Sequence, residues 1–154
     1  MVARFAWSEL FAVGHDRLDG QHRHLVDLIA RFCTSVHASE DLLTLKSLLT
    51  AIKRATREHL RSENAVLREL KAKARSSGPE RRSVPRHLAA ATDAAIEDHI
   101  AEHRNMMRRL TTIADRVDTI PRSDRPTLCA DVKAWFLDHA VKHDAHLKTI
   151  FQAL

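Results

Sequence analysis

The segment IEDHIAEHRNMMRRL, residues 96–110, has an apolar stripe at helical spacing, and two histidines stand within that stripe. Residues three and four positions apart lie on the same face of an α-helix. The segment therefore predicts a helix that carries two imidazole groups on its apolar side. The positions that share this face are Ile96, His99, His103, Met106 and Leu110.

Three other segments combine an apolar stripe with polar residues at the same spacing. His22 extends the stripe of the first helix, His59 and Glu63 interrupt that of the second, and His139 interrupts that of the fourth. One buried histidine is common in a core, whereas one in each of four helices indicates a shared role. We expect helices from an N-cap at Asp19 to about Val36, from about 41 to 74, from after Pro85 to about 117, and from a cap at Ser123 or Asp124, with Pro126 in the first turn, to about 150.

The composition favours helices along the whole chain. Hydrophobic residues make up 44% of the sequence, and only three glycines and four prolines interrupt it. Leu, Ala, Arg, Glu and Lys, which favour helices, are abundant. Because two of the three connections are short, we expect an all-α fold, an up-down-up-down antiparallel four-helix bundle in a single domain of residues 1–154. This domain includes an N-terminal arm, residues 1–18, and a longer basic loop between the second and third helices, residues 71–86.

The net charge of +5 is modest, and basic residues alternate with acidic ones over most of the chain. This pattern favours a solvated surface, so we expect neither nucleic acid nor a membrane as a partner, and the sequence leaves the identity of a protein partner open. The loop 71–86 is interpreted as solvated, with docking of an acidic partner as the alternative. Cys33 and Cys129 are too few for a disulfide framework and indicate a reducing compartment. With no signal-like start and no apolar run of about 20 residues, the chain is expected to be cytoplasmic.

The polar stripe residues are predicted to meet at one level of the bundle. If neighbouring helices run antiparallel, the distances from each turn to the polar residues on either side must match. The number of residues between a turn and the polar residue on either side of it agrees within two for all three turns. Two residues correspond to about 3 Å at the helical rise. Asp144 follows His139 by five residues, about 140° around an α-helix, so it is expected to reach the site from the flank, where His143 competes with it.

Five imidazoles and two carboxylates at one level indicate a metal site. Burying two carboxylates among polar groups is costly unless cations compensate. No cysteine belongs to the set, and calcium or magnesium would favour oxygen ligands. Seven ligands exceed the four of one tetrahedral zinc, so two metal ions that share carboxylates fit better. Imidazole binds Fe, Zn, Cu and Ni, so the donor type alone does not select a metal. Iron is favoured by the arrangement, in which two metal ions share carboxylates.

Five motifs in this chain resemble those of the hemerythrin family, specifically its single-domain bacterial members. They occur in the family's order and span nearly the whole chain. The resemblance implies a four-helix bundle with two non-haem iron ions and an oxo or hydroxo bridge, a centre that binds dioxygen reversibly. The motifs are Trp7, VGHDRLDGQHRHLVDL at 13–28, HLRSE at 59–63, HIAEH at 99–103 and WFLDHAVKHD at 135–144.

The resemblance also implies how the ligands divide. One iron would have three histidines, the other two, and both carboxylates would bridge, so the iron with two histidines keeps one open position for dioxygen. Trp135, Leu25 and Ile29 would wall the site from water, although plain core packing explains them equally well. The implied ligands are His99, His103 and His139 for the first iron, His22 and His59 for the second, and Glu63 and Asp144 as bridges.

This chain departs from the family's pattern near the second helix's ligands. The family often has an acidic residue after the bridging glutamate and an aromatic residue after the preceding histidine, and here these positions are Asn64 and Leu60. His24 is expected to be exposed. His15 is a candidate for an entrance position, and His143 and His146 are candidates for partners of the ligands, whereas His37 and His87 are expected at helix ends.

Three functions compete on this reading. The first is an oxygen-binding module for storage, delivery or sensing, with dioxygen as ligand and nitric oxide or peroxide as alternatives. The second is a di-iron enzyme on the same scaffold, such as a peroxidase, a ferroxidase or a detoxifier of reactive nitrogen. The third is an iron store or an interaction protein that uses the basic loop.

Overall fold

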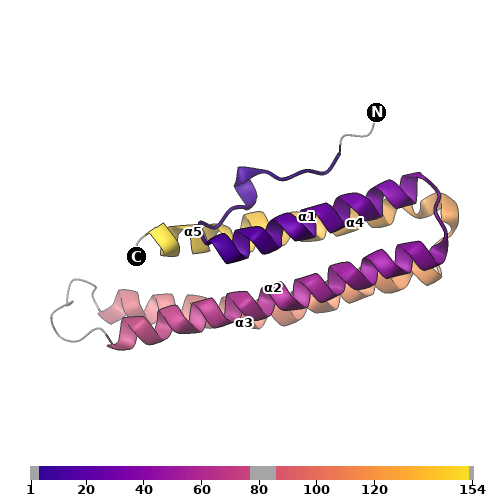
Figure 1. Cartoon of the computed structure of the whole chain (residues 1–154). Coiled ribbons are helices and arrows are strands. Elements are labelled where there is room, and N and C mark those ends of the chain that lie inside the picture. The colour runs from indigo at the N-terminus through magenta and orange to yellow at the C-terminus, as the bar shows by residue number, and fades with distance from the viewer. Residues whose placement is uncertain (1–3, 77–85, 153–154) are drawn as a thin grey trace.

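The computed structural model describes residues 4–76 and 86–152, and this part of the chain consists of helices and their connections, without a strand. The chain begins with a short 3-10 helix and continues into the long helices of Figure 1. Two further 3-10 turns, Arg116–Asp118 and Arg122–Asp124, join α3 to α4. The elements are η1 (Glu9–Phe11), α1 (Asp16–His37), α2 (Leu42–Ser76), α3 (Arg86–Asp115), α4 (Pro126–Leu137), a π-helical turn (Asp138–His143) and α5 (Ala145–Gln152).

The four long helices form an elongated bundle. Figure 1 shows α1 and α4 as one pair lying over the pair α2 and α3, and contacts join α1 to α2 and α3 to α4 as well. Two ion pairs set the direction of α3 against α2: Lys46 with Asp118 at 2.8 Å, and Lys71 with Glu97 at 2.7 Å. Residue numbers rise along α2 as they fall along α3, so these two helices run antiparallel.

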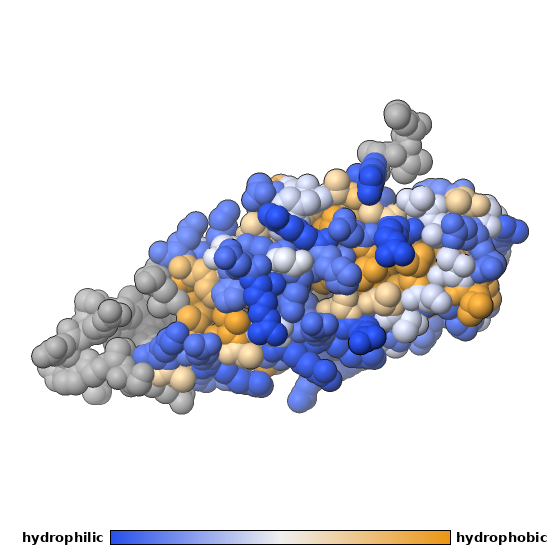
Figure 2. Space-filling model, in the orientation of Figure 1, coloured by the Kyte–Doolittle hydropathy of each residue, from blue (hydrophilic) through white to orange (hydrophobic). Residues whose placement is uncertain are grey.

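The apolar core of the bundle is divided by a polar layer. A large cluster fills the end near the α1–α2 turn and includes Phe32, Ile52, Leu110 and Phe136, all fully buried. Full burial of such a side chain stabilises the fold by about 1.5–3 kcal/mol. Figure 2 shows hydrophilic residues over most of one face, with hydrophobic residues visible in a band between α1 and α2. The smaller cluster at the other end consists of Val13, Leu18, Leu67, Ile96 and Leu147.

The first helix begins earlier than expected. We predicted Asp19 as its N-cap, but α1 begins at Asp16 and His15 is the cap residue, so the segment before the helix is shorter than residues 1–18. The Asp19 carboxylate instead accepts the backbone N–H groups of Val13, at 2.7 Å, and Gly14, at 3.2 Å. Gly14 has a φ of 85°, a conformation that favours glycine, and the turn there leads the chain into α1.

The second helix ends later than expected. α2 continues to Ser76, so residues 71–76 of the predicted basic loop are helical. Residues 77–85 of that predicted loop lie outside the described residues. α3 begins at Arg86, directly after Pro85, as predicted from the proline.

The fourth helix is not continuous, although one helix to about residue 150 was predicted. The six residues Asp138–His143 form a π-helical turn, and the backbone N–H of Asp144 donates to the carbonyl of His139 at 3.0 Å. This i→i+5 bond replaces the i→i+4 bond of an α-helix and adds one residue to the turn. The periodicity of the sequence could not show it, because the apolar positions on both sides remain compatible with one helix.

Residues 4–15 pack aromatic side chains against α4. The Phe11 ring lies edge-on to Phe136 at 5.3 Å between centroids, and Phe5 and Trp7 lie against the same cluster. No helix in the described part of the chain is both long and apolar enough to cross a membrane.

Candidate metal centre

All seven predicted ligand side chains gather in the polar layer between the two apolar clusters. His22 comes from α1, His59 and Glu63 from α2, and His99 and His103 from α3. His139 lies within the π-helical turn, and Asp144 directly follows it. Each of the seven is at most 5% exposed. The level predicted by counting residues from the turns is therefore the level at which the side chains meet.

The π-helical turn changes how Asp144 reaches the site. In an α-helix, five residues rotate a side chain about 140° away from its starting face. The wider turn brings Asp144 onto the face of His139 instead, and its Oδ2 lies 2.9 Å from the Nε2 of His139. The expected approach from the flank is therefore wrong. His143, the expected competitor, is half-buried and lies with its Nε2 3.7 Å from the Asp138 carboxylate.

Each carboxylate faces two groups of histidines. Glu63 Oε1 contacts His99 and lies 3.2 Å from His103, while its Oε2 lies 3.0 Å from His59. Asp144 repeats the arrangement: Oδ1 lies 3.4 Å from His99, and Oδ2 lies 3.1 Å from His22. Each carboxylate thus presents one oxygen to either side.

The potential ligand atoms form two sets that share Glu63. One set is His22, His59, Glu63, His139 and Asp144, and the other is Glu63, His99 and His103. Within each set, one ligand atom per residue lies within 4.8 Å of the others. The resemblance placed His139 with His99 and His103, whereas here its Nε2 lies 3.1 Å from that of His59.

Three of the histidines are oriented by hydrogen bonds from their outer nitrogens. Nδ1 of His22 donates to the carbonyl of Phe11 at 2.8 Å, and Nδ1 of His59 to the side-chain oxygen of Gln21 at 3.2 Å. Nδ1 of His103 donates to Oδ1 of Asn64 at 2.7 Å. Such bonds fix the tautomer and aim Nε2 inward, as second partners do in metal sites.

The inward atoms fit a metal ion better than they fit one another. Because Nδ1 of His22 and Nδ1 of His59 donate outward, their two Nε2 atoms face each other at 3.0 Å, and a cation between them would accept both lone pairs. Glu63 Oε2 and both Asp144 oxygens are buried without a hydrogen-bond partner among the described residues. Unpaired buried polar atoms are costly, and a cation among these lone pairs would remove that cost.

Comparison with known families agrees with this donor set. The model of the family "Hemerythrin HHE cation binding domain" matches residues 13–151, nearly the whole chain. The chain belongs to the hemerythrin family. No curated protein and no solved structure gives a match in the comparisons made. The seven histidine, glutamate and aspartate side chains of this hemerythrin domain and its family together indicate a cation-binding protein.

Electrostatics inside the hemerythrin domain favour charged carboxylates. Burial and the neighbouring Asp144 oppose ionisation of Glu63, but the imidazoles of His103, His59 and His99, all close to its oxygens, hold the pKa of Glu63 well below the usual value. Burial also opposes ionisation of Asp144, and His139 together with His22 holds the pKa of Asp144 well below its usual value. Both carboxylates are therefore anionic at neutral pH.

The histidines divide the compensating charge unequally. Burial opposes protonation of His99, yet the nearby carboxylates of Asp144 and Glu63 raise its pKa to about 9. Burial lowers the pKa of His59 to about 4. In the metal-free protein, His99 is therefore cationic and His59 neutral, and a metal ion must displace the proton of His99 to bind there.

Apolar side chains surround the hemerythrin site on the side of the large cluster. The three predicted wall residues, Trp135, Leu25 and Ile29, are all buried. Trp135 Nε1 donates to the carbonyl of Met106 at 3.0 Å, and the Phe136 ring lies edge-on to His22 at 5.9 Å between centroids. The burial of Trp135, Leu25 and Ile29 is compatible both with a wall that keeps water from the site and with plain core packing.

The remaining histidines lie outside the ligand set. His24 is exposed, as predicted from its place on the opposite face of α1. The His146 ring packs against His99 at 4.9 Å between centroids, and His15 packs against Phe151 at 5.4 Å. The reasoning from sequence missed Phe11 and Gln21 as orienting partners, because nothing in a periodic pattern reports a backbone carbonyl or an amide.

Proposed function

We propose that this protein holds a non-haem di-iron centre and binds dioxygen reversibly. The observation that carries the proposal is that Glu63 and Asp144 each present one oxygen to either group of histidines. A carboxylate with a separate contact on each side is suited to bridge two metal ions. Five imidazoles then supply the remaining ligands, and imidazole is a good donor for iron.

The division of ligands leaves one metal short of a full shell. The resemblance assigns three histidines, His99, His103 and His139, to one iron and two, His22 and His59, to the other. If His139 stays with His22 and His59, the numbers are reversed and the open position lies beside His99 and His103. In both cases two bridging carboxylates and five imidazoles leave one ion with one imidazole fewer.

When bound, the iron pair supplies the electrons that reversible dioxygen binding requires. The chain supplies the surroundings: His22, His59 and His103 are held by neutral acceptors, a backbone carbonyl and two side-chain amides. A neutral acceptor increases the basicity of an imidazole less than a carboxylate does. With only two anionic ligands, the site is less suited to stabilise high oxidation states than a carboxylate-rich one, which favours binding over enzymatic turnover.

The proposal includes the architecture predicted from sequence. We propose a single hemerythrin domain in residues 1–154 with up-down-up-down helix order and an N-terminal arm that covers the site through Phe11. The carbonyl of Phe11 accepts from His22, which supports a role of the arm in orienting a ligand.

The test is anaerobic loading with ferrous iron, followed by metal analysis and rapid mixing with dioxygen. Two irons per chain and an optical band that appears with dioxygen and disappears on its removal would support the proposal. One iron per chain, or a band that cannot be reversed while peroxide or nitric oxide is consumed, would contradict it. The latter result would identify the di-iron enzyme as the function.

A further inference from the structure

A group of exposed arginines covers the outer face of α2 and α3. None of them forms an ion pair or a side-chain hydrogen bond with another described residue. Exposed arginines without counter-charges are free to bind a partner, whereas paired ones first have to give up an existing contact. The group, here called the arginine face, consists of Arg54, Arg57, Arg61 and Arg68 on α2 and Arg104 and Arg108 on α3.

Helical geometry brings these arginines together. The α2 members are three, four and seven residues apart and lie on the side of α2 that is turned toward α3. The Asn64–His103 hydrogen bond identifies that side and sets the level, because it joins the two antiparallel helices. At this level Arg104 lies opposite Arg61, and Arg108 lies opposite Arg57, so the two rows form one surface.

Some cations elsewhere on the bundle are held in ion pairs, among them those that border the arginine face. Lys46 and Lys71 bind acidic residues at the two ends of the α2–α3 seam, and Arg109 and Arg116 bind acidic residues of the π-helical turn and α4. Between the Lys46–Asp118 and Lys71–Glu97 pairs, no described carboxylate forms an ion pair with a member of the arginine face. Along the α2–α3 seam, the arginine face is therefore a continuous stretch of positive charge that no ion pair compensates.

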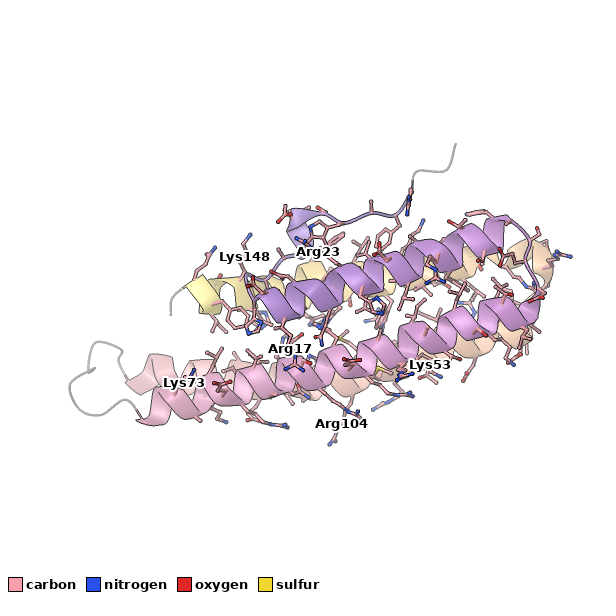
Figure 3. The ribbon with its side chains drawn as sticks, viewed as in Figure 1. Arg17, Arg23, Lys53, Lys73, Arg104 and Lys148 are labelled. Carbon is pink, nitrogen blue, oxygen red and sulfur yellow. The ribbon has the colours of Figure 1, made fainter. Side chains whose placement is uncertain are left out.

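The arginine face lies directly outside the metal ligands. Arg104 follows His103 in the chain, and Asn64, which holds the His103 ring, is itself only half-buried. One layer of side chains thus separates the arginine face from His103. Figure 3 shows Arg104 projecting away from α1 and the N-terminal segment, while Lys148 and Arg23 lie on the other side of the molecule.

We propose that the arginine face docks a small acidic protein that transfers single electrons to the metal centre. This inference rests on the proposed function, because an electron carrier that docks here needs a redox-active metal in the site as its electron acceptor. Two encounters are required: in each, the reduced partner loses one electron and one ferric ion becomes ferrous. The electrons cross the layer formed by Asn64 and His103.

The shape of the arginine face favours a protein over a polymer or a lipid surface. From Arg54 to Arg68 it extends about 21 Å at the helical rise, close to the width of a standard interface of about 800 Å² per partner. Arginine forms paired hydrogen bonds with carboxylates and is common in protein interfaces. No exposed aromatic residue was found among the described residues of this face to stack on bases or enter a bilayer.

The experiment uses the iron-loaded protein and a reduced acidic [2Fe–2S] ferredoxin as the probe. The double variant Arg57→Glu with Arg104→Glu removes charge from the arginine face. The control, Arg31→Glu with Lys148→Glu, makes the same change of four charge units at exposed residues elsewhere. We expect the face variant, and not the control, to lower the association rate with ferredoxin by about tenfold or more at low salt.

Reduction of the ferric protein gives the second measurement. The face variant should be reduced more slowly by ferredoxin and at the normal rate by dithionite, which needs no docking surface. Equal loss in both double variants, or tighter binding of duplex DNA or anionic vesicles than of ferredoxin at the same face, would overturn the inference. Iron content is measured first, so failure to load iron counts against the proposed function and not against the docking surface.

Discussion

Asp144 follows His139 by five residues, and yet its Oδ2 lies 2.9 Å from the Nε2 of that histidine. The π-helical turn between them makes this possible, since an α-helix would point the two side chains in different directions. The same turn points His143 outward, toward Asp138. One additional residue in one turn thus selects which side chain of the HAVKHD segment enters the core.

Removing the charge of Asp144 should impair metal binding. Asp144→Asn keeps the size of the side chain but loses an anionic bridge, so we expect fewer than two irons per chain by metal analysis after anaerobic loading. Asp138→Asn is the matched control, because Asp138 belongs to the same turn and pairs with Arg109 outside the ligand set. Normal loading of Asp144→Asn would show that this residue does not bridge.

The register of α1 can be tested with two neighbouring histidines. His22 is fully buried among the ligands, whereas His24 is exposed, so His22→Ala should lose iron and His24→Ala should load normally. Because metal binding stabilises the folded state, the thermal midpoint of the loaded protein should fall only for His22→Ala. Loss of iron from His24→Ala would mean that α1 is rotated relative to this structure.

The amide at position 64 should tune the metal site without contacting it. Asn64→Ala leaves Nδ1 of His103 without its acceptor, so we expect about 10–100-fold weaker metal binding in a competition titration. Asn64→Asp should restore or exceed the original affinity, since a carboxylate accepts the same hydrogen bond. Asn105→Ala serves as control, because Asn105 is exposed and bonds Glu102 on the outer side of α3. If Asn64→Ala and Asn105→Ala bind equally well, the orienting role is wrong.

The stability of the metal-free protein should depend on pH in both directions. The pKa of His99 is raised from 6.5 to about 9. The contribution of His99 to the stability of the folded state is therefore complete below pH 6.5 and is lost as the pH rises through 9. The pKa of His59 is lowered to about 4, so the unfolded chain binds this proton first and stability falls as the pH decreases from 6.5 to 4. We therefore expect the highest thermal midpoint near pH 6.5.

Denaturation of the metal-free protein across pH 4 to 10 measures this dependence. His99→Gln should make the alkaline side of the profile shallower and leave the acidic side, because one of the two histidines with a raised pKa is removed and His139 remains. An alkaline side that is unchanged in this variant would contradict the assignment to His99.

Much of the fold follows from periodicity, as α3 illustrates. Its stripe from Ile96 to Leu110 predicted a helix with two inward histidines, and both are buried. The N-cap of α1 was predicted four residues late, at Asp19 and not at His15, because Asp19 has the chemistry of a cap and uses it on the preceding turn, at Val13 and Gly14. Helix ends depend on such local competition, which spacing alone does not reveal.

The helical class, the faces on which the histidines and carboxylates lie, and the common level of His22, Glu63 and His103 could all be predicted from the order of residues, because these follow from a constant rise and rotation per residue. The inward position of Asp144, the side of the cluster on which His139 lies, and the partners that hold the imidazoles became visible in the folded molecule alone. Each of these depends on contacts between residues distant in the chain or on one wide turn, and a periodic pattern contains neither.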